Sequence, residues 1–169
     1  CVSAGAIMPA KLNYDFEEYF NIELLDGYGI TETSTMVTMN WSGKERNMGS
    51  CGLPLPGMCV RIIDGNDLDV KPGEEGELIC RGPNVMIGYH KKENETDKIL
   101  KNGWYYTGDL AKQDLNGFIT ITGRLKEIII RGGQNISPTE VEEAILKNSK
   151  ILDCAVVGLK HSELGEIPA

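Results

Sequence analysis

The chain has 169 residues, of which 41% are hydrophobic and 25% charged, so it can bury the core of one domain or of one domain plus part of a second. Its 25 acidic and 17 basic residues give a net charge of −8, which argues against a nucleic-acid partner bound by clustered Lys and Arg. No apolar run approaches the roughly 20 residues that a membrane span needs. The chain begins at Cys1 without an apolar leader, so we expect no signal peptide and two cut ends.

The first elements follow from hydrophobic spacing. Leu12, Phe16 and Phe20 fall near helical spacing, which predicts a helix over residues 9–20. An apolar strand is expected over residues 22–25. From about residue 49 to 122, β-rich runs alternate with glycine turns, which predicts a small antiparallel sheet or barrel. Its strands are expected at residues 58–63, 77–81 and 118–122, with a largely polar helix over residues 93–100.

The pattern changes beyond Gly123. A strand is expected over residues 127–131, a turn at Gly132-Gly133 and a helix over residues 137–148. Ser137-Pro138-Thr139-Glu140 predicts the start of that helix, because it combines a capping box with proline at the first helical position. The apolar residues 151–159 then predict a buried strand. This order indicates a second domain that begins near residue 125.

The five cysteines are odd in number, and no two have the spacing of a zinc site. We expect most of them to be buried and reduced, which favours a cytoplasmic protein. His90 and His161 stand in polar surroundings and are expected at the surface.

The first candidate site is Asp26-Gly27-Tyr28-Gly29-Ile30-Thr31-Glu32. Two glycines permit a tight or left-handed backbone, and an exposed Tyr28 can lay its ring on a planar base. Thr31 and free amides can bind phosphate oxygens, while Glu32 can ligate Mg²⁺ beside a phosphate. The alternative is a plain strand-to-loop turn in which Tyr28 packs on the sheet.

Three further segments carry polar groups beside turns. Asp109, which follows Thr107-Gly108, can accept two hydrogen bonds from the hydroxyls of a ribose, or it can bond its own turn. Arg124 can reach a phosphate or ribose oxygen, or pair with a neighbouring acid. Lys126 lies where a linker would bend. Gly132-Gly133 can let a ligand approach the backbone, although a hairpin turn also explains it.

Taken together and in this order, these segments resemble the adenylate-forming superfamily of acyl-CoA synthetases, firefly luciferase and peptide-synthetase adenylation domains. The matching motifs are Tyr28 to Glu32 (Tyr-Gly-x-Thr-Glu), Tyr105 to Asp109 (Tyr-x-Thr-Gly-Asp) and Gly123 to Glu142 (Gly-Arg-x-Lys-Glu and the paired-glycine segment). Ser3 to Pro9 resembles a fourth, Ser-Gly-Ala-Ala-Pro, although proline is usual where Ile7 stands. The resemblance implies a mixed α/β fold. Residues 1–124 would end the large domain, with its β-barrel subdomain at about 49–122, and residues 125–169 would begin the small mobile domain.

The resemblance also implies a reaction and its ligands. A carboxylate attacks the α-phosphorus of ATP to give an acyl-adenylate and pyrophosphate, and a thiol then displaces AMP. The cofactors implied are ATP/AMP, Mg²⁺ and coenzyme A, and the partners are a small carboxylate with coenzyme A or a carrier-protein pantetheine. The implied contacts are Gly5, Ala6 and Ile7 for adenine; Asp26, Gly27, Tyr28, Gly29, Ile30 and Thr31 for adenine and phosphate; Glu32 for Mg²⁺; Asp109 for the ribose hydroxyls; Arg124 for ribose or phosphate; and Gly132 and Gly133 for pantetheine. Lys126 matches the hinge.

Two parts of that pattern do not occur in the 169 residues: the Ser/Thr/Gly-rich phosphate loop that ends in lysine, and the lysine that drives adenylation. We therefore expect the chain alone to form neither adenylates nor thioesters. Two alternatives stay open: a nucleotide-binding or interaction module without turnover, and a piece of a peptide-synthetase adenylation domain.

Overall fold

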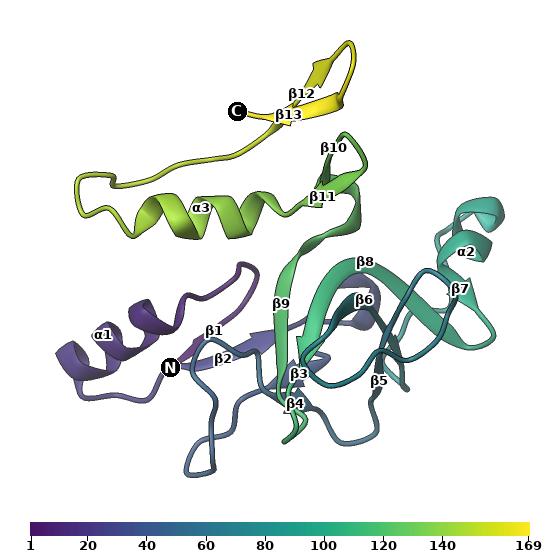
Figure 1. Ribbon diagram of the computed structural model, residues 1–169. Helices are drawn as coiled ribbons and strands as arrows, with labels where there is room; N and C mark the ends of the chain where they lie inside the picture. Colours follow the sequence, from purple (N-terminus) through teal and green to yellow (C-terminus); the bar gives the residue numbers. More distant parts are fainter. The chain divides into compact units, whose positions relative to one another are not determined.

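The computed structural model describes residues 1–169 (Figure 1). These residues form two compact units. The first unit comprises Cys1–Thr107 and Ala111–Ile121, and the second comprises Gly108–Leu110 and Thr122–Ala169. The main change of unit thus falls at residues 121/122, close to the expected border at 124/125. That these units are a large domain and a mobile domain stays a prediction. None of the helices is long and apolar enough to cross a membrane.

The first unit begins with a four-stranded sheet in the order β1-β2-β3-β4. The strands are β1 (Val2–Ser3), β2 (Leu25–Tyr28), β3 (Thr38–Met39) and β4 (Leu53–Pro54). β1 and β2 are parallel, whereas the other pairs are antiparallel. The strand expected at residues 22–25 is therefore misplaced. Gly27 and Tyr28 pair with Met39 and Thr38, which extends β2 through the glycine motif.

Helix α1 (Ala10–Phe20) confirms the helix expected near the N-terminus. It ends at Asn21, whose left-handed backbone donates its N–H to the Glu17 carbonyl at 2.9 Å. The helix contacts the rest of the unit through polar side chains: Asn13 is buried and Glu17 binds Arg46. Most of its aromatic residues instead lie on the outside: Tyr14, Tyr19 and Phe20 are exposed, and Phe20 contacts both Tyr19 and the half-buried Phe16.

A curled five-stranded sheet forms the half-barrel of the first unit and confirms the mixed α/β fold class. β6 is paired with β5 and β8, and β8 also pairs with β7 and β9. The elements are β5 (Cys59–Ile63), β6 (Glu75–Arg81), α2 (Glu93–Ile99), β7 (Leu100–Lys101), β8 (Trp104–Gln113) and β9 (Ile119–Arg124). Strand β8 was not predicted, because the glycine in Tyr-x-Thr-Gly-Asp suggested a turn. The aromatic and threonine residues before that glycine are strong strand formers.

Nine buried side chains form the core of the first unit: Val37, Cys51, Met58, Ile62, Leu78, Cys80, Tyr105, Ala111 and Ile119. Burial raises the pKa of the Cys51 thiol to about 11 and that of Cys80 to about 12, so both stay protonated. The expectation of mostly buried cysteines is wrong, since Cys1 and Cys59 are exposed and Cys154 is half-buried. All five are free thiols. His90 is exposed, as expected, and His161 is half-buried.

The second unit contains a four-stranded antiparallel sheet in the order β11-β10-β13-β12. Its elements are η2 (Leu125–Glu127), β10 (Ile129–Arg131), β11 (Gln134–Ile136), α3 (Pro138–Leu146), β12 (Gly158–His161) and β13 (Gly165–Pro168). The start of α3 is as expected, with Pro138 at its first position. Of the expected capping box, the structure forms the bond from the Glu140 N–H to Ser137 Oγ at 3.4 Å.

Two strand expectations in this unit need correction. The strand expected over residues 127–131 begins only at Ile129, because Leu125–Glu127 forms a 3-10 turn. The buried strand expected over residues 151–159 is wrong: residues 151–157 are irregular and Leu152 is 97% exposed. Helix α3 binds the backbone of this segment instead, because Glu142 Oε1 accepts a hydrogen bond from the Val156 N–H at 2.7 Å.

Candidate nucleotide-binding site

The carboxyl ends of the two parallel strands position the first half of the candidate site. Val2 pairs with Leu25 and Ser3 with Asp26, so the chain leaves β1 and β2 at the same edge of the sheet. Residues 5–7 follow β1 and residues 29–31 follow β2. Ligands of open α/β sheets bind outside the carboxyl ends of parallel strands. The two predicted segments lie together at this edge of the sheet.

The segment after β1 is open to solvent. Gly5 has a left-handed backbone (φ 95°), and a side chain there would meet no atom within 4 Å. Ala6 and Ile7 are also exposed. These residues form a free surface on which a planar group can lie, and the chain's own packing does not account for them.

The loop after β2 is compact because its glycines provide space. A Cβ on Gly29 would lie 1.4 Å from the Thr35 carbonyl oxygen, and one on Gly27 would lie 2.3 Å from Met36 Cε. Neither glycine has a positive φ, so the left-handed backbone considered from the sequence is absent at both. Gly29 is required because the backbone of Thr35 and Met36 lies against it, whereas the atom nearest to Gly27 is the end of the flexible Met36 side chain.

A buried threonine holds the turn of this loop. Thr33, in η1 (Thr31–Thr33), donates its hydroxyl to the Ile30 carbonyl at 3.0 Å, and the Ile30 N–H donates to Thr33 Oγ1 at 3.3 Å. Thr31, one residue before the metal candidate Glu32, is exposed at the start of the same turn. Thr31 is thus free to meet a phosphate while Thr33 maintains the backbone.

Tyr28 is half-buried at the end of β2 and packs against the core of the first unit. This contact agrees with the alternative in which Tyr28 packs on the sheet. Its stacking on a base stays a prediction.

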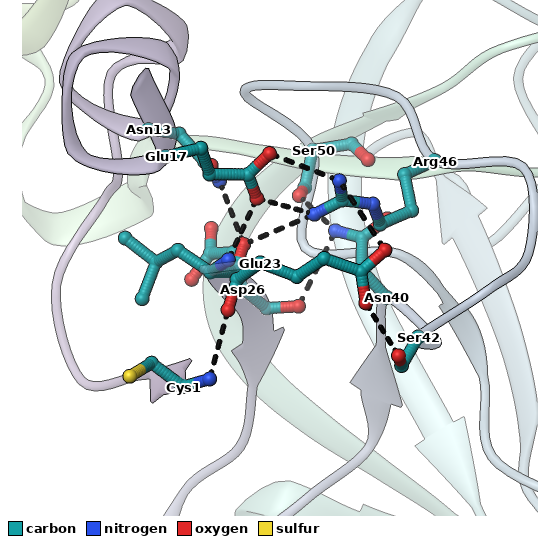
Figure 2. A network of polar contacts seen from close by, with 10 residues as sticks. Cys1, Asn13, Glu17, Glu23, Asp26, Asn40, Ser42, Arg46 and Ser50 are labelled. Atoms are coloured by element: carbon teal, nitrogen blue, oxygen red, sulfur yellow. Dashed lines mark hydrogen bonds and ion pairs between the residues drawn. The ribbon is translucent and has the colours of Figure 1, made fainter. Parts of the chain in front are cut away.

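Asp26 lies at the centre of a buried polar network (Figure 2). Its carboxylate accepts the Gly27 N–H at 3.0 Å, and its carbonyl accepts both the N–H and the side-chain amide of Asn40. Burial raises the pKa of Asp26 to about 6. The Asp26 carboxyl group is therefore partly protonated close to neutral pH.

This shift predicts a pH-dependent stability. The folded state holds the Asp26 proton more tightly than the unfolded chain, so its contribution to the free energy of unfolding falls as pH rises through about 6. We expect that contribution to be about 1 kcal/mol larger at pH 5 than at pH 8, and to disappear in Asp26→Asn. Urea unfolding at both pH values measures the difference.

Asp64→Asn is the matched control for this experiment. Hydrogen bonds from the Leu68 and Asn66 N–H groups lower the pKa of Asp64, so its titration lies below pH 5. The control should retain the difference between pH 5 and pH 8. An Asp26→Asn protein that also retains it would contradict the assignment to Asp26.

Glu32 is half-buried and is held by a segment more than fifty residues away in the sequence. Its Oε1 accepts the Tyr89 hydroxyl at 2.6 Å, and its carbonyl accepts the Met86 N–H at 2.7 Å. Oε2 is left free for a cation. No group of three or more His, Cys, Asp or Glu side chains could hold a metal ion. A single carboxylate fits Mg²⁺, which is usually bound by one or two carboxylates together with substrate phosphates.

The second unit carries the ribose candidates. Arg124 Nε lies 3.0 Å from Asp109 Oδ1, and the Asp109 side chain is almost fully buried while that of Arg124 is half exposed. The acid that the sequence analysis left open as the partner of Arg124 is thus Asp109 itself. The pair presents a carboxylate fixed in orientation by a guanidinium.

The remaining candidates of the second unit lie in turns. Lys126 is exposed in η2. Gly132 and Gly133 form the two-residue turn between β10 and β11, with φ values of 57° and 85°. Such turns require positive φ at both positions, so the hairpin alone accounts for the glycines. Their approach to a pantetheine and the hinge role of Lys126 stay predictions.

Comparison with known proteins identifies the family. The sequence profile of the AMP-binding enzymes matches residues 1–90. The chain is 39% identical over 168 residues to the long-chain-fatty-acid–CoA ligase of Salmonella typhimurium, covering 98% of this chain and 30% of that enzyme. It is 40% identical over 164 residues to the medium-chain fatty-acid–CoA ligase of Escherichia coli, covering 96% and 29%. The chain thus spans about a third of the length of these relatives.

Solved structures agree with this result. ATP-bound MatB from Rhodopseudomonas palustris matches with a TM-score of 0.93 and 32% identity, over 99% of this chain and 33% of that one. The o-succinylbenzoate CoA synthetase MenE from Bacillus subtilis, in complex with its acyl-adenylate, matches with a TM-score of 0.88 and 31% identity, over 99% and 34%. The chain belongs to the family of AMP-binding enzymes.

No motif in the sequence indicated the residues that support Glu32. Tyr89 and Met86 bond it directly, and Asn84 Nδ2 donates to the carbonyls of Thr33 and Met36, both at 2.9 Å. None of these three residues belongs to a motif quoted above, so nothing in the sequence indicated which loop they contact.

Proposed function

We propose that these residues form part of an ATP-dependent acid–thiol ligase, which makes an acyl-adenylate and then a coenzyme A thioester. The observation that carries the proposal is the position of residues 5–7 and 29–31 at the carboxyl ends of adjacent parallel strands. The family membership and the ligase activities of the named relatives support it.

In the first step, a carboxylate attacks the α-phosphorus of ATP and pyrophosphate leaves. We assign adenine to Gly5, Ala6, Ile7 and Tyr28, and phosphate to Thr31 and the neighbouring amides. Asp109, oriented by Arg124, accepts the ribose hydroxyls. Glu32 would hold Mg²⁺, which neutralises phosphate charge when bound. The chain's residues position the nucleotide and neutralise the charge of its phosphates, and they need to do little covalent chemistry themselves.

In the second step, the thiol of coenzyme A attacks the acyl carbon and AMP leaves. We propose that Lys126 is the point about which the small domain turns between the two steps, and that Gly132 and Gly133 border the pantetheine. A hinge of this kind needs only a few residues to absorb the change in backbone angles. The exposure of all three residues supports these roles.

Fatty acids are the acyl substrates that the comparisons favour. The fatty-acid ligases are 38–41% identical to this chain, whereas the matched structures of an anthranilate CoA ligase, of MatB and of an o-succinylbenzoate CoA synthetase are 29–32% identical. We therefore propose a fatty acid as the carboxylate, with coenzyme A as its acceptor.

The proposal predicts nucleotide binding without turnover by the 169-residue chain. Isothermal titration should detect weak binding of AMP, and Asp109→Ala should weaken it at least tenfold, because hydrogen bonds to a charged group contribute about 1.5–3 kcal/mol. Pyrophosphate exchange should stay at background, since the chain contains neither the phosphate loop nor the adenylating lysine.

Two variants make this test specific. Asp109→Asn keeps the shape of the buried side chain and should also weaken binding, which separates ligand contact from loss of packing. Asp97→Ala removes an exposed carboxylate on α2 and should bind like the parent. Absence of AMP binding by the parent would refute the nucleotide site, and sustained ATP-dependent exchange would refute the predicted inactivity.

A further inference from the structure

Glu32 is held at two points by one distant segment of the first unit. Tyr89 donates its hydroxyl to Glu32 Oε1 at 2.6 Å, and Met86, three residues earlier, donates its N–H to the Glu32 carbonyl at 2.7 Å. Asn84 in the same segment donates to two carbonyls of the same loop, those of Thr33 and Met36. Side chain and backbone of Glu32 are thus fixed together by residues 84–89.

The hydroxyl of Tyr89 belongs to a short chain of hydrogen bonds. A carboxylate can only accept, so Tyr89 must direct its hydrogen toward Glu32. Its oxygen then remains as an acceptor, and the side chain of buried Tyr105 hydrogen-bonds to Tyr89. Tyr105 begins the Tyr-x-Thr-Gly-Asp motif. The chain Tyr105–Tyr89–Glu32 connects the half-barrel core to the candidate metal ligand.

We propose that Tyr89 is a positioning residue, which holds the Glu32 carboxylate with Oε2 free for the Mg²⁺ of a bound nucleotide. This inference rests on the proposed function of Glu32. A free glutamate side chain samples many rotamers and loses that freedom when it binds an ion. The hydrogen bond from Tyr89 already restricts the Glu32 side chain before the ion binds, so less conformational entropy is lost on binding. This preorganisation raises the affinity for Mg²⁺.

The backbone of Tyr89 makes a separate hydrogen bond, which does not involve its hydroxyl. The Tyr89 N–H donates to Thr96 Oγ1 at 2.9 Å, and the Thr96 hydroxyl donates to the Lys92 carbonyl at 3.0 Å. Helix α2 (Glu93–Ile99) therefore contacts the main chain of Tyr89, whereas Glu32 binds the hydroxyl. Thr96 does not bond the carboxylate, which makes it a suitable control position.

The experiment measures the affinity of the 169-residue chain for ATP with and without Mg²⁺, by isothermal titration. In Tyr89→Phe, the gain in affinity that Mg²⁺ provides should fall about three- to tenfold. Affinities for AMP and for metal-free ATP should stay unchanged. Thr96→Val should behave like the parent, although it removes a bond to the same residue. In electron paramagnetic resonance with ATP present, the signal of bound Mn²⁺ should weaken in Tyr89→Phe and stay unchanged in Thr96→Val.

A double variant separates positioning from a general loss of structure. Glu32→Gln should abolish the Mg²⁺-dependent gain, and adding Tyr89→Phe to it should cause no further loss if Tyr89 acts through Glu32. An unchanged Mg²⁺ response in Tyr89→Phe, or equal losses with and without Mg²⁺, would overturn the inference while the nucleotide site stands. Failure of the parent chain to bind ATP or AMP at all would instead overturn the proposed function.

Discussion

Gly29→Ala should destabilise the protein by more than about 3 kcal/mol, because overpacking against rigid backbone exceeds the usual range of core substitutions. The added Cβ would lie 1.4 Å from the Thr35 oxygen, 2.3 Å from the Thr35 carbonyl carbon and 2.7 Å from Met36 Cα. These atoms are all backbone, so no rotamer change relieves the clash. The loop after β2 has to open, and the nucleotide segment loses its shape. Urea unfolding followed by circular dichroism gives the free energy.

Gly65→Ala is the matched control for Gly29. A Cβ at Gly65 meets no atom within 4 Å, and the residue has no positive φ. The substitution should change the free energy of unfolding by less than about 0.5 kcal/mol, or stabilise slightly through the unfolded chain. AMP binding should survive in Gly65→Ala and be lost in Gly29→Ala. Equal stability of the two variants would contradict the close approach at Gly29.

Local signals in the sequence predicted the elements whose formation depends on near neighbours. The spacing of apolar residues gave α1, and Ser137-Pro138 gave the start of α3. The glycine turns gave the curled sheet, although β8 was missed around Asp109. The apolar run at residues 151–157 failed as a strand because α3 supplies the partner of the Val156 N–H, which no local pattern records.

The motifs in the sequence predicted which residues belong to the candidate site. They did not predict the distant residues that hold this site in place through hydrogen bonds and ion pairs. The residues from Asp26 to Glu32 were predicted to form a nucleotide-binding loop, and the parallel pairing of β1 with β2 is compatible with that prediction. The bond between Tyr89 and Glu32 joins residues 57 apart in the sequence, and Glu17 and Arg46 are 29 apart. A single sequence carries no periodicity that connects such positions, so only the fold reveals them.

The ion pair between Glu17 and Arg46 fixes α1 beside the start of β2, the strand that precedes the candidate nucleotide-binding loop (Figure 2). Arg46 contacts both carboxylate oxygens, at 2.6 and 3.0 Å, and Glu17 Oε1 also accepts the Leu24 N–H at 2.6 Å. The side chains are only 14% and 20% exposed. The hydrogen bond from Arg46 is the main reason why the pKa of Glu17 is lowered.

Arg46→Met should therefore destabilise the protein by about 2 kcal/mol, somewhat less than a fully buried pair, because it leaves the Glu17 charge in a poorly hydrated position. The lowered pKa of Glu17 adds stability at neutral pH that is lost as pH falls below 4.5, so the difference between parent and variant should shrink in acid. Lys11→Met is the control on the same helix: its pair with Asp15 is 83% and 55% exposed and should contribute less than about 0.5 kcal/mol. If urea unfolding at pH 7 gave equal losses for the two variants, the pair would be acting as an ordinary surface contact, and the anchoring of α1 would have to come from Asn13 alone.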